Sequence, residues 1–363
     1  MKKIVSLLML VFLLLLLAAC GGGSGTTSTD NNNDQETETD ASEPADEENE
    51  SASNITGEQQ TLRVSIGVND KHPQYEGALK FKEIVESKTD DFVVEVYHSG
   101  QVADDRSAIE MLQFGTLEIT IPSTSPLVNF VKEYGVFDLP FTIPSGEVAD
   151  QVLDGPFGDK MFDLLGDQQL VGLAWWENGF RNLTNSVRPV EKVEDLQGLK
   201  IRTMENEIHL DAWRELGANP TPMAFPELFA AMQQGTVDGQ ENPYPTIELS
   251  NFYEVQDYLS STGHVYTPFI FLFSKSIWDE LTADQQTIIR EAALEAGQFN
   301  RQRNREANES SLEALKEHMT FSEISPEEHQ RFQDTILPVI EKHADNIGKD
   351  IVDDFLEEIA KHQ

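Results

Sequence analysis

Basic residues and cysteine are scarce in this chain. Its 363 residues include 26 Lys and Arg against 64 Asp and Glu, which gives a formal net charge of −38. Because so negative a chain repels phosphates, we exclude nucleic acid as a partner. Cys20 is the only cysteine, so the chain can form no intramolecular disulfide.

The sequence motifs of several enzyme classes are also missing. The eight histidines show no H-E-x-x-H spacing, and neither G-x-S-x-G nor G-x-x-x-x-G-K-S/T occurs. We therefore expect binding without chemistry, with no metal and no cofactor. Two alternatives stay open. One is a hydrolase that uses paired carboxylates, for which so acidic a chain offers many candidates, and the other is a structural or adhesive surface lipoprotein.

The amino terminus predicts export and a lipid anchor. Two lysines precede an apolar run over residues 4–19, and the segment ends in L-A-A-C at Cys20. The run is too short and wrongly flanked for a spanning helix, whereas a signal peptide over residues 1–20 with a lipobox fits it. We expect a diacylglyceryl thioether at Cys20 and a protein held at the outer face of the cell membrane. An ordinary signal peptide with an incidental cysteine is the alternative.

Residues 21–60 predict a disordered acidic tether. They consist of Gly, Ser, Thr, Asn, Asp and Glu with almost no large apolar side chain. Burial therefore cannot offset the entropy lost on ordering them. The folded domain is expected over residues 61–363, and because this exceeds the usual size of one core, two lobes are expected.

The first half of this domain alternates strand and helix signals. Strands are expected over 61–68, 92–97 and 117–121, and helices over 75–87 and 104–114. This β-α-β-α-β order implies a parallel sheet with crossover helices. We expect a first lobe over about 61–180 with later crossover segments, and a second over about 185–270.

Further elements complete an α/β fold. A helix is expected over 148–165, followed by a pair of strands over 171–176 and 181–184. The second lobe should hold strands over 200–203, 219–222 and 236–238 and helices over 207–216 and 225–233. A capping box at 282–285 opens a long helix whose stretch N-R-Q-R-N-R-E-A-N-E-S-S is polar on every side, so it must face solvent or bridge the lobes. Two more helices are expected over 327–343 and 347–360.

Two arginines stand at the ends of expected strands. Arg181 follows W-W-E-N-G-F, and Arg202 ends G-L-K-I-R. Ligands of open α/β sheets bind beyond the carboxyl ends of the strands, and the planar fork of arginine suits a carboxylate. The alternative is that either arginine pairs with a local acid, namely Glu177, Glu205 or Glu241.

Several motifs in one order resemble the solute-binding proteins of tripartite ATP-independent periplasmic (TRAP) transporters, the DctP-like family. They are G-F-R-N-L-T-N, E-D-L-Q-G-L-K-I-R, L-G-A-N-P-T-P-M-A-F and T-V-D-G-Q-E-N-P, followed by Y-E-V-Q-D-Y-L-S-S-T-G-H. The resemblance covers roughly residues 61–363. It implies a two-lobed, hinge-connected periplasmic-binding-protein-like fold with mixed sheets and a long bridging helix. It also implies delivery of a small organic acid to a permease with a small and a large membrane subunit, driven by an ion gradient.

The resemblance assigns roles to five residues. Arg202 matches the arginine that makes the main salt bridge to the ligand carboxylate, and Arg181 matches a second that assists it. Asn242 matches an asparagine that hydrogen-bonds the ligand. Asn69 and Ser123 match positions that touch its distal, selective part.

Four further residues complete the predicted site, and some of them have plainer explanations. His72 lies near Asn69, but a lone histidine is as often structural. Phe225 matches a pocket aromatic, yet it could be core packing, just as Asn242 could merely shape a turn before proline. Met204 and Asn206 belong to I-R-T-M-E-N-E, where many members of the family have I-R-V-P. Because this adds polarity for hydroxyl groups, we favour a hexuronate, aldonate or keto-sugar acid over a four-carbon dicarboxylate.

Overall fold

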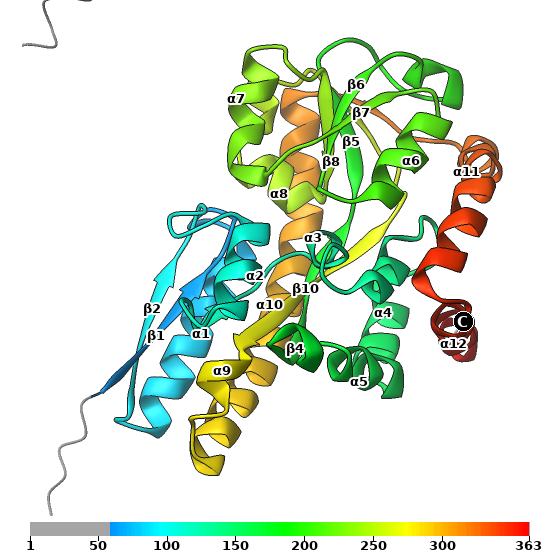
Figure 1. Ribbon diagram of the computed structural model, residues 1–363. Coiled ribbons are helices and arrows are strands. Elements are labelled where there is room, and N and C mark those ends of the chain that lie inside the picture. The colour runs from blue at the N-terminus through cyan, green and yellow to red at the C-terminus, as the bar shows by residue number, and fades with distance from the viewer. Residues whose placement is uncertain (1–58, 363) are drawn as a thin grey trace, which may run out of the picture. The chain divides into compact units, whose positions relative to one another are not determined.

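The computed structural model describes residues 59–362 (Figure 1). The signal peptide and nearly all of the tether, including Cys20, lie outside the described residues. Two sheets form the framework. The first has the strand order β2-β1-β3-β10-β4, and the second has the order β11-β9-β5-β8-β6-β7.

The first sheet is mixed. Its strands are β1 (Gln60–Ser65), β2 (Phe92–Tyr97), β3 (Ile119–Thr120), β4 (Leu170–Phe180) and β10 (Tyr266–Ser274). Strand β1 pairs in parallel with both β2 and β3, whereas β10 is antiparallel to β3 and β4. Helices α1 (Pro73–Lys88) and α2 (Asp105–Gln113) form the crossovers. The expected β-α-β-α-β unit is confirmed.

The second sheet carries the other lobe. Its strands are β5 (Asn182–Asn185), β6 (Lys200–Thr203), β7 (Asn219–Pro222), β8 (Gly239–Asn242), β9 (Tyr258–Ser260) and β11 (Thr320–Ser322). Helices α6 (Glu207–Glu215), α7 (Leu228–Gln233) and α8 (Tyr244–Leu249) connect them. The two-lobed α/β fold with mixed sheets is confirmed.

Three local expectations were wrong. The expected strand pair does not form, because β4 and β5 belong to different sheets and the chain crosses between the lobes at Arg181, whose N–H donates to Val265 O (2.9 Å). The expected helix over 148–165 is two helices, α4 (Gly146–Leu153) and α5 (Pro156–Asp163). Pro156 causes the break, since it has no N–H to donate. The strand expected over 236–238 lies at β8, so Asn242 ends that strand.

Helix α10 (Ala283–His318) is the long bridging helix, and its predicted capping box at Thr282 is present (Figure 1). Part of its polar stretch is buried against β4, the edge strand of the first sheet. Asn300 Oδ1 accepts from Glu177 N (2.9 Å), and Asn304 Nδ2 donates to Asn178 O (3.0 Å). These side chains occupy backbone groups that an edge strand would otherwise leave unpaired.

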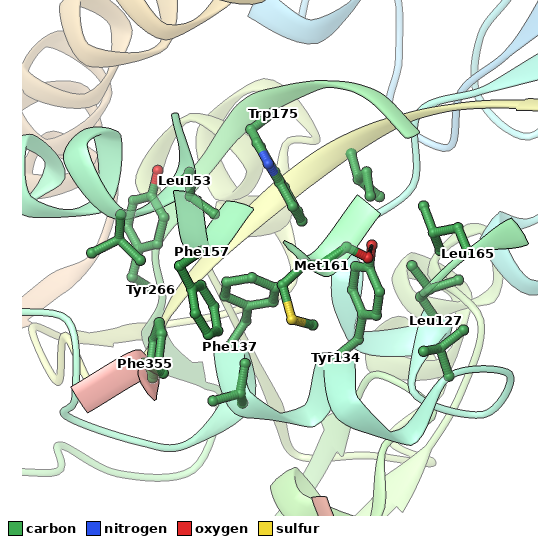
Figure 2. Close-up of a cluster of buried hydrophobic side chains, with 14 of the residues drawn as sticks. Leu127, Tyr134, Phe137, Leu153, Phe157, Met161, Leu165, Trp175, Tyr266 and Phe355 are labelled. Carbon is green, nitrogen blue, oxygen red and sulfur yellow. Dashed lines mark hydrogen bonds between the residues drawn. The ribbon is translucent and has the colours of Figure 1, made fainter. Parts of the chain in front are cut away.

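Aromatic side chains gather in one of the buried hydrophobic clusters, where Phe137, Phe157 and Trp175 lie close together (Figure 2). Trp175 stacks on Phe162, with ring centroids 4.7 Å apart, and Phe137 packs edge-on against Trp175 (5.2 Å). Helices α11 (Pro326–Ile347) and α12 (Lys349–Lys361) border this cluster, and Phe355 from α12 joins it. Among residues 59–362, no helix is both long and apolar enough to cross a bilayer.

Candidate ligand-binding site

A pocket lies between the two lobes, with a volume of about 580 Å³ including the part open to solvent. Its walls come from the ends of β1, β4, β6 and β8 and from the start of α2. Six of the predicted site residues line it, and they are Arg181, Arg202, Asn242, Ser123, Met204 and Phe225. The strand-end argument therefore located the pocket, because the carboxyl ends of strands in both sheets meet there.

Arg202 is a buried cation without a counter-charge. It lies at the end of β6 and is 2% exposed. Its Nε and Nη2 donate to the carbonyl oxygen of Met223 (2.9 and 2.7 Å), and its buried Nη1 has no partner. No carboxylate among residues 59–362 forms an ion pair with it; Glu205 instead faces Arg106 (3.8 Å). Burial lowers the pKa of Arg202 to about 10, so it remains protonated at neutral pH.

Arg181 is held by a local acid, as the alternative interpretation proposed. Its Nε lies 2.5 Å from Glu241 Oε2, and its Nη2 donates to Glu241 Oε1 (2.9 Å). His264 Nε2 lies 3.1 Å from Glu241 Oε2. Burial opposes ionisation of Glu241, but the charge of Arg181 and the hydrogen bond from His264 hold its pKa well below the usual value. One nitrogen of the Arg181 guanidinium, Nη1, is still buried and has no hydrogen-bond partner among the described residues.

The two arginines together give the pocket unpaired donors and an uncompensated positive charge. Each presents a buried Nη1 donor without a partner, and a buried donor left unpaired costs about 1–3 kcal/mol, more when it is charged. Glu241 neutralises Arg181, whereas Arg202 keeps its full charge. A carboxylate that enters the pocket would supply both the missing acceptors and the missing negative charge.

The facing wall carries a carboxyl group that the sequence reasoning missed. Asp105 begins α2, and its Oδ2 accepts from Ser123 N (3.2 Å). Its Oδ1 lies 3.0 Å from where a Cβ of Gly67 would stand, so a glycine permits this approach. Burial raises the pKa of Asp105 to about 6. The two adjacent acids in A-D-D-R could have indicated this carboxyl group. Asp104 alone caps α2, so the cap does not account for Asp105.

Ser123 adds a second polar group to this wall, since its buried Oγ has no partner among the described residues. Met204 borders the arginine side of the pocket. Phe225 lines the pocket and also packs against Phe252 (5.9 Å), so it serves both roles considered for it. Asn242 donates from Nδ2 to Gln240 Oε1.

Three predicted residues do not line the pocket, and their polar atoms bind protein instead. Asn69 donates to Leu249 O (2.8 Å) and accepts from a backbone N–H. His72 caps α1 and contacts Thr246 Oγ1 through Nε2 (3.1 Å); burial lowers its pKa to about 3.

The side-chain amide of Asn206 is also hydrogen-bonded to other protein groups. Its Oδ1 accepts from Ile208 N (2.8 Å) at the start of α6, and its Nδ2 donates to Asp138 Oδ2 (2.7 Å). This corrects the expectation that Asn69 and Asn206 read ligand hydroxyls, because their amides already join the two lobes. No group of three or more His, Cys, Asp or Glu within residues 59–362 is placed to hold a metal ion.

Comparison with known proteins assigns the family. Residues 64–346 match the model of the bacterial extracellular solute-binding proteins, family 7 (DctP). The chain belongs to this family and is a DctP-like TRAP solute-binding protein. Such proteins are extracytoplasmic, bind small organic acids and work with membrane permease subunits.

Relatives with different ligands resemble the chain. It is 42% identical to the sugar acid binding protein DctPAm of Advenella mimigardefordensis, whose structure holds galactonate, at a TM-score of 0.83 over 84% of this chain and 99% of that one. A Polaromonas protein bound to D-erythronate is 37% identical, at a TM-score of 0.79 over 82% and 98%. The C4-dicarboxylate-binding protein DctB of Bacillus subtilis is 31% identical over 83% of this chain and 87% of its own length.

Proposed function

We propose that the protein captures a hydroxylated sugar acid, an aldonate or hexuronate, and delivers it to its permease. The observation that carries this proposal is the unpaired charge of Arg202 in a buried pocket faced by Asp105. In this proposal the ligand carboxylate binds Nη1 of Arg202 and of Arg181. The hydroxyl groups donate to the carboxylate of Asp105 and bond with Ser123 Oγ.

Asp105 favours a sugar acid over a four-carbon dicarboxylate. The second carboxylate of a dicarboxylate would lie near this buried acid, and the repulsion between the two like charges would weaken binding. The similarity to galactonate and erythronate binders supports the same choice. The dicarboxylate alternative keeps one supporting observation, which is that Arg106 also lines the pocket and could pair with a second carboxylate.

Titration calorimetry tests the proposal directly. D-galactonate, D-erythronate, D-glucuronate and succinate would be titrated into the purified protein, with product analysis after long incubation. We expect saturable binding of at least one sugar acid, weaker binding of succinate and no turnover. Preference for succinate would support the dicarboxylate alternative, and turnover would support a hydrolase.

Ligand preference should depend on pH through Asp105. Its pKa of about 6 means that it is ionised at pH 8 and protonated at pH 5. If its carboxylate accepts ligand hydroxyls, sugar-acid affinity should fall as the pH drops through 6. Asp105→Asn should remove this trend, as measured by calorimetry at the two pH values.

Asp105→Asn should also change the melting temperature of the unliganded protein. A carboxyl whose pKa is raised in the folded state destabilises the protein as the pH rises from its unfolded value through the folded one. Unliganded Asp105→Asn should therefore melt higher than the wild type at pH 8, with a smaller difference at pH 5. A sugar-acid affinity that fell equally with pH in Asp105→Asn and in the wild type would contradict the role given to Asp105.

Capture is proposed to proceed by hinge closure. Contacts between the lobes, such as Asn69 to Leu249 O and Asn206 to Asp138, join the two sides of the pocket. An open form would lack them, and a ligand that bridges both walls would favour the closed form by its differential affinity.

Anchoring through Cys20 is part of the proposal, supported by the lipobox in the sequence. Cys20→Ala should release the protein from the membrane fraction while ligand affinity stays unchanged, because the site lies within residues 59–362. Metabolic labelling with a radioactive fatty acid measures the modification. Label that persists in the variant would contradict lipidation at Cys20.

A further inference from the structure

A line of buried hydrogen bonds runs from the segment before β9 across the neighbouring strands β5 and β8 of the second sheet and ends at the pocket. It begins at Gln256, just before β9, continues through Thr184 on β5, and reaches Gln240 and Asn242 on β8. All four residues are buried, and Thr184 lies directly opposite Gln240 in the β5–β8 register. Of the four, only Asn242 lines the pocket.

The direction of this line is set at its far end. Gln256 Nε2 donates to two backbone carbonyls, Val255 O (2.8 Å) and Asp238 O (3.3 Å). Carbonyl oxygens only accept hydrogen bonds, so the amide nitrogen of Gln256 must face them. Its Oε1 therefore faces Thr184, whose hydroxyl donates to it (3.0 Å).

Each later group follows from the one before it. A hydroxyl that donates to Gln256 can still accept, and Thr184 Oγ1 accepts from Gln240 Nε2 (2.9 Å). The Oε1 atom of Gln240 therefore points toward Asn242. Because this oxygen only accepts, Asn242 donates to it from its amide nitrogen Nδ2. Reversing Asn242 would place two oxygens against each other or leave a buried group unpaired.

We propose that Thr184, Gln240 and Gln256 are positioning residues that hold Asn242 with Oδ1 toward the pocket. An acceptor at this point selects a ligand group that donates, which a hydroxyl does and a carboxylate oxygen does not. The second Nδ2 hydrogen of Asn242 remains available to a ligand oxygen. This inference rests on the proposed function, since it assigns one hydroxyl contact of the sugar acid to Asn242 Oδ1.

Thr184→Val breaks the line with little change of shape, and Thr184→Ser is the matched control that keeps the hydroxyl. D-galactonate and its monodeoxy analogues would be titrated into the wild type and both variants. In the wild type, one analogue should lack the ligand hydroxyl that donates to Asn242 Oδ1. That analogue should bind about threefold to tenfold more weakly than galactonate, as expected for one neutral hydrogen bond. In Thr184→Val this difference should shrink to less than twofold, because Asn242 and Gln240 can then reverse together. Thr184→Ser should keep it.

A merely structural role for Thr184 would weaken all the ligands by one common factor and leave their ratios unchanged, and that result would overturn the proposal. Neutron diffraction from unliganded, deuterium-exchanged crystals tests the orientation without any ligand. Deuterium on the Asn242 atom that faces Gln240 supports the proposal, and an oxygen there overturns it. If no sugar acid bound the wild type, the proposed function would fail, while the neutron map would still decide the orientation of Asn242.

Discussion

Arg202→Ala is expected to lower the affinity for the organic acid by about 2–5 kcal/mol, which is roughly thirtyfold to a few thousandfold. The guanidinium has only Met223 O as a partner and has no counter-charge among the described residues, so the ligand carboxylate is the group it is placed to bind. Arg202→Lys should also weaken binding, by at least about 1.5–3 kcal/mol, because lysine keeps the charge but lacks the planar fork. Titration calorimetry measures both losses.

The stability of the unliganded Arg202 variants distinguishes a binding residue from a structural one. A buried charge without a counter-charge is desolvated at a cost, so its removal should leave the melting temperature unchanged or raise it. Arg188→Ala is a suitable control, because Arg188, like Arg202, donates to backbone carbonyl oxygen, here of Asp195 and Gln197, but does not line the pocket. An Arg202→Ala protein that bound normally and melted much earlier would show that the site is misplaced.

Glu241→Gln should have its largest effect on folding. It leaves Arg181 buried without its counter-charge, and breaking a buried ion pair in this way costs about 3–5 kcal/mol. At roughly 2–4 °C per kcal/mol for a large domain, the melting temperature should fall by about 6–20 °C. A ligand carboxylate could then become the counter-charge of Arg181, so saturating ligand should raise the melting temperature more in the variant than in the wild type. Differential scanning calorimetry with and without ligand measures both effects.

The pH dependence of this loss has a definite sign. The pKa of Glu241 is lowered in the folded state, so its contribution to stability is present above its unfolded value of about 4.5 and is lost as the pH falls toward the folded value. The deficit of Glu241→Gln should thus be complete at pH 7 and shrink on acidification below about 4.5. Glu205→Gln is the control, because its contact with Arg106 is long (3.8 Å) and partly exposed. Equal melting temperatures for Glu241→Gln and the wild type at pH 7 would contradict the Arg181–Glu241 account.

Local patterns were enough for most of the elements and failed where the partner of a segment lay far away. The capping box at Thr282 and the strand at β6 depend on neighbouring residues, and both were predictable. The separation of β4 from β5 was not, because each strand is defined by a partner far along the chain: β10 for β4, and β8 and β9 for β5. The helix break at Pro156 was predictable, since proline has no N–H to donate, and the expectation of one helix over 148–165 overlooked it.

The sequence by itself determined the family, the alternation of strands and helices, and the presence of Arg181 and Arg202 at strand ends. Only the tertiary structure decided which of their N–H groups stay unpaired. It showed Arg181 bound to Glu241, 60 residues away, and Asn69 bound to Leu249, 180 residues away. It also placed Asp105 opposite the arginines and set the orientation of Asn242. The sequence specifies the chemical type of each side chain. Which of its donors and acceptors remain free depends on the hydrogen bonds it makes with residues far along the chain.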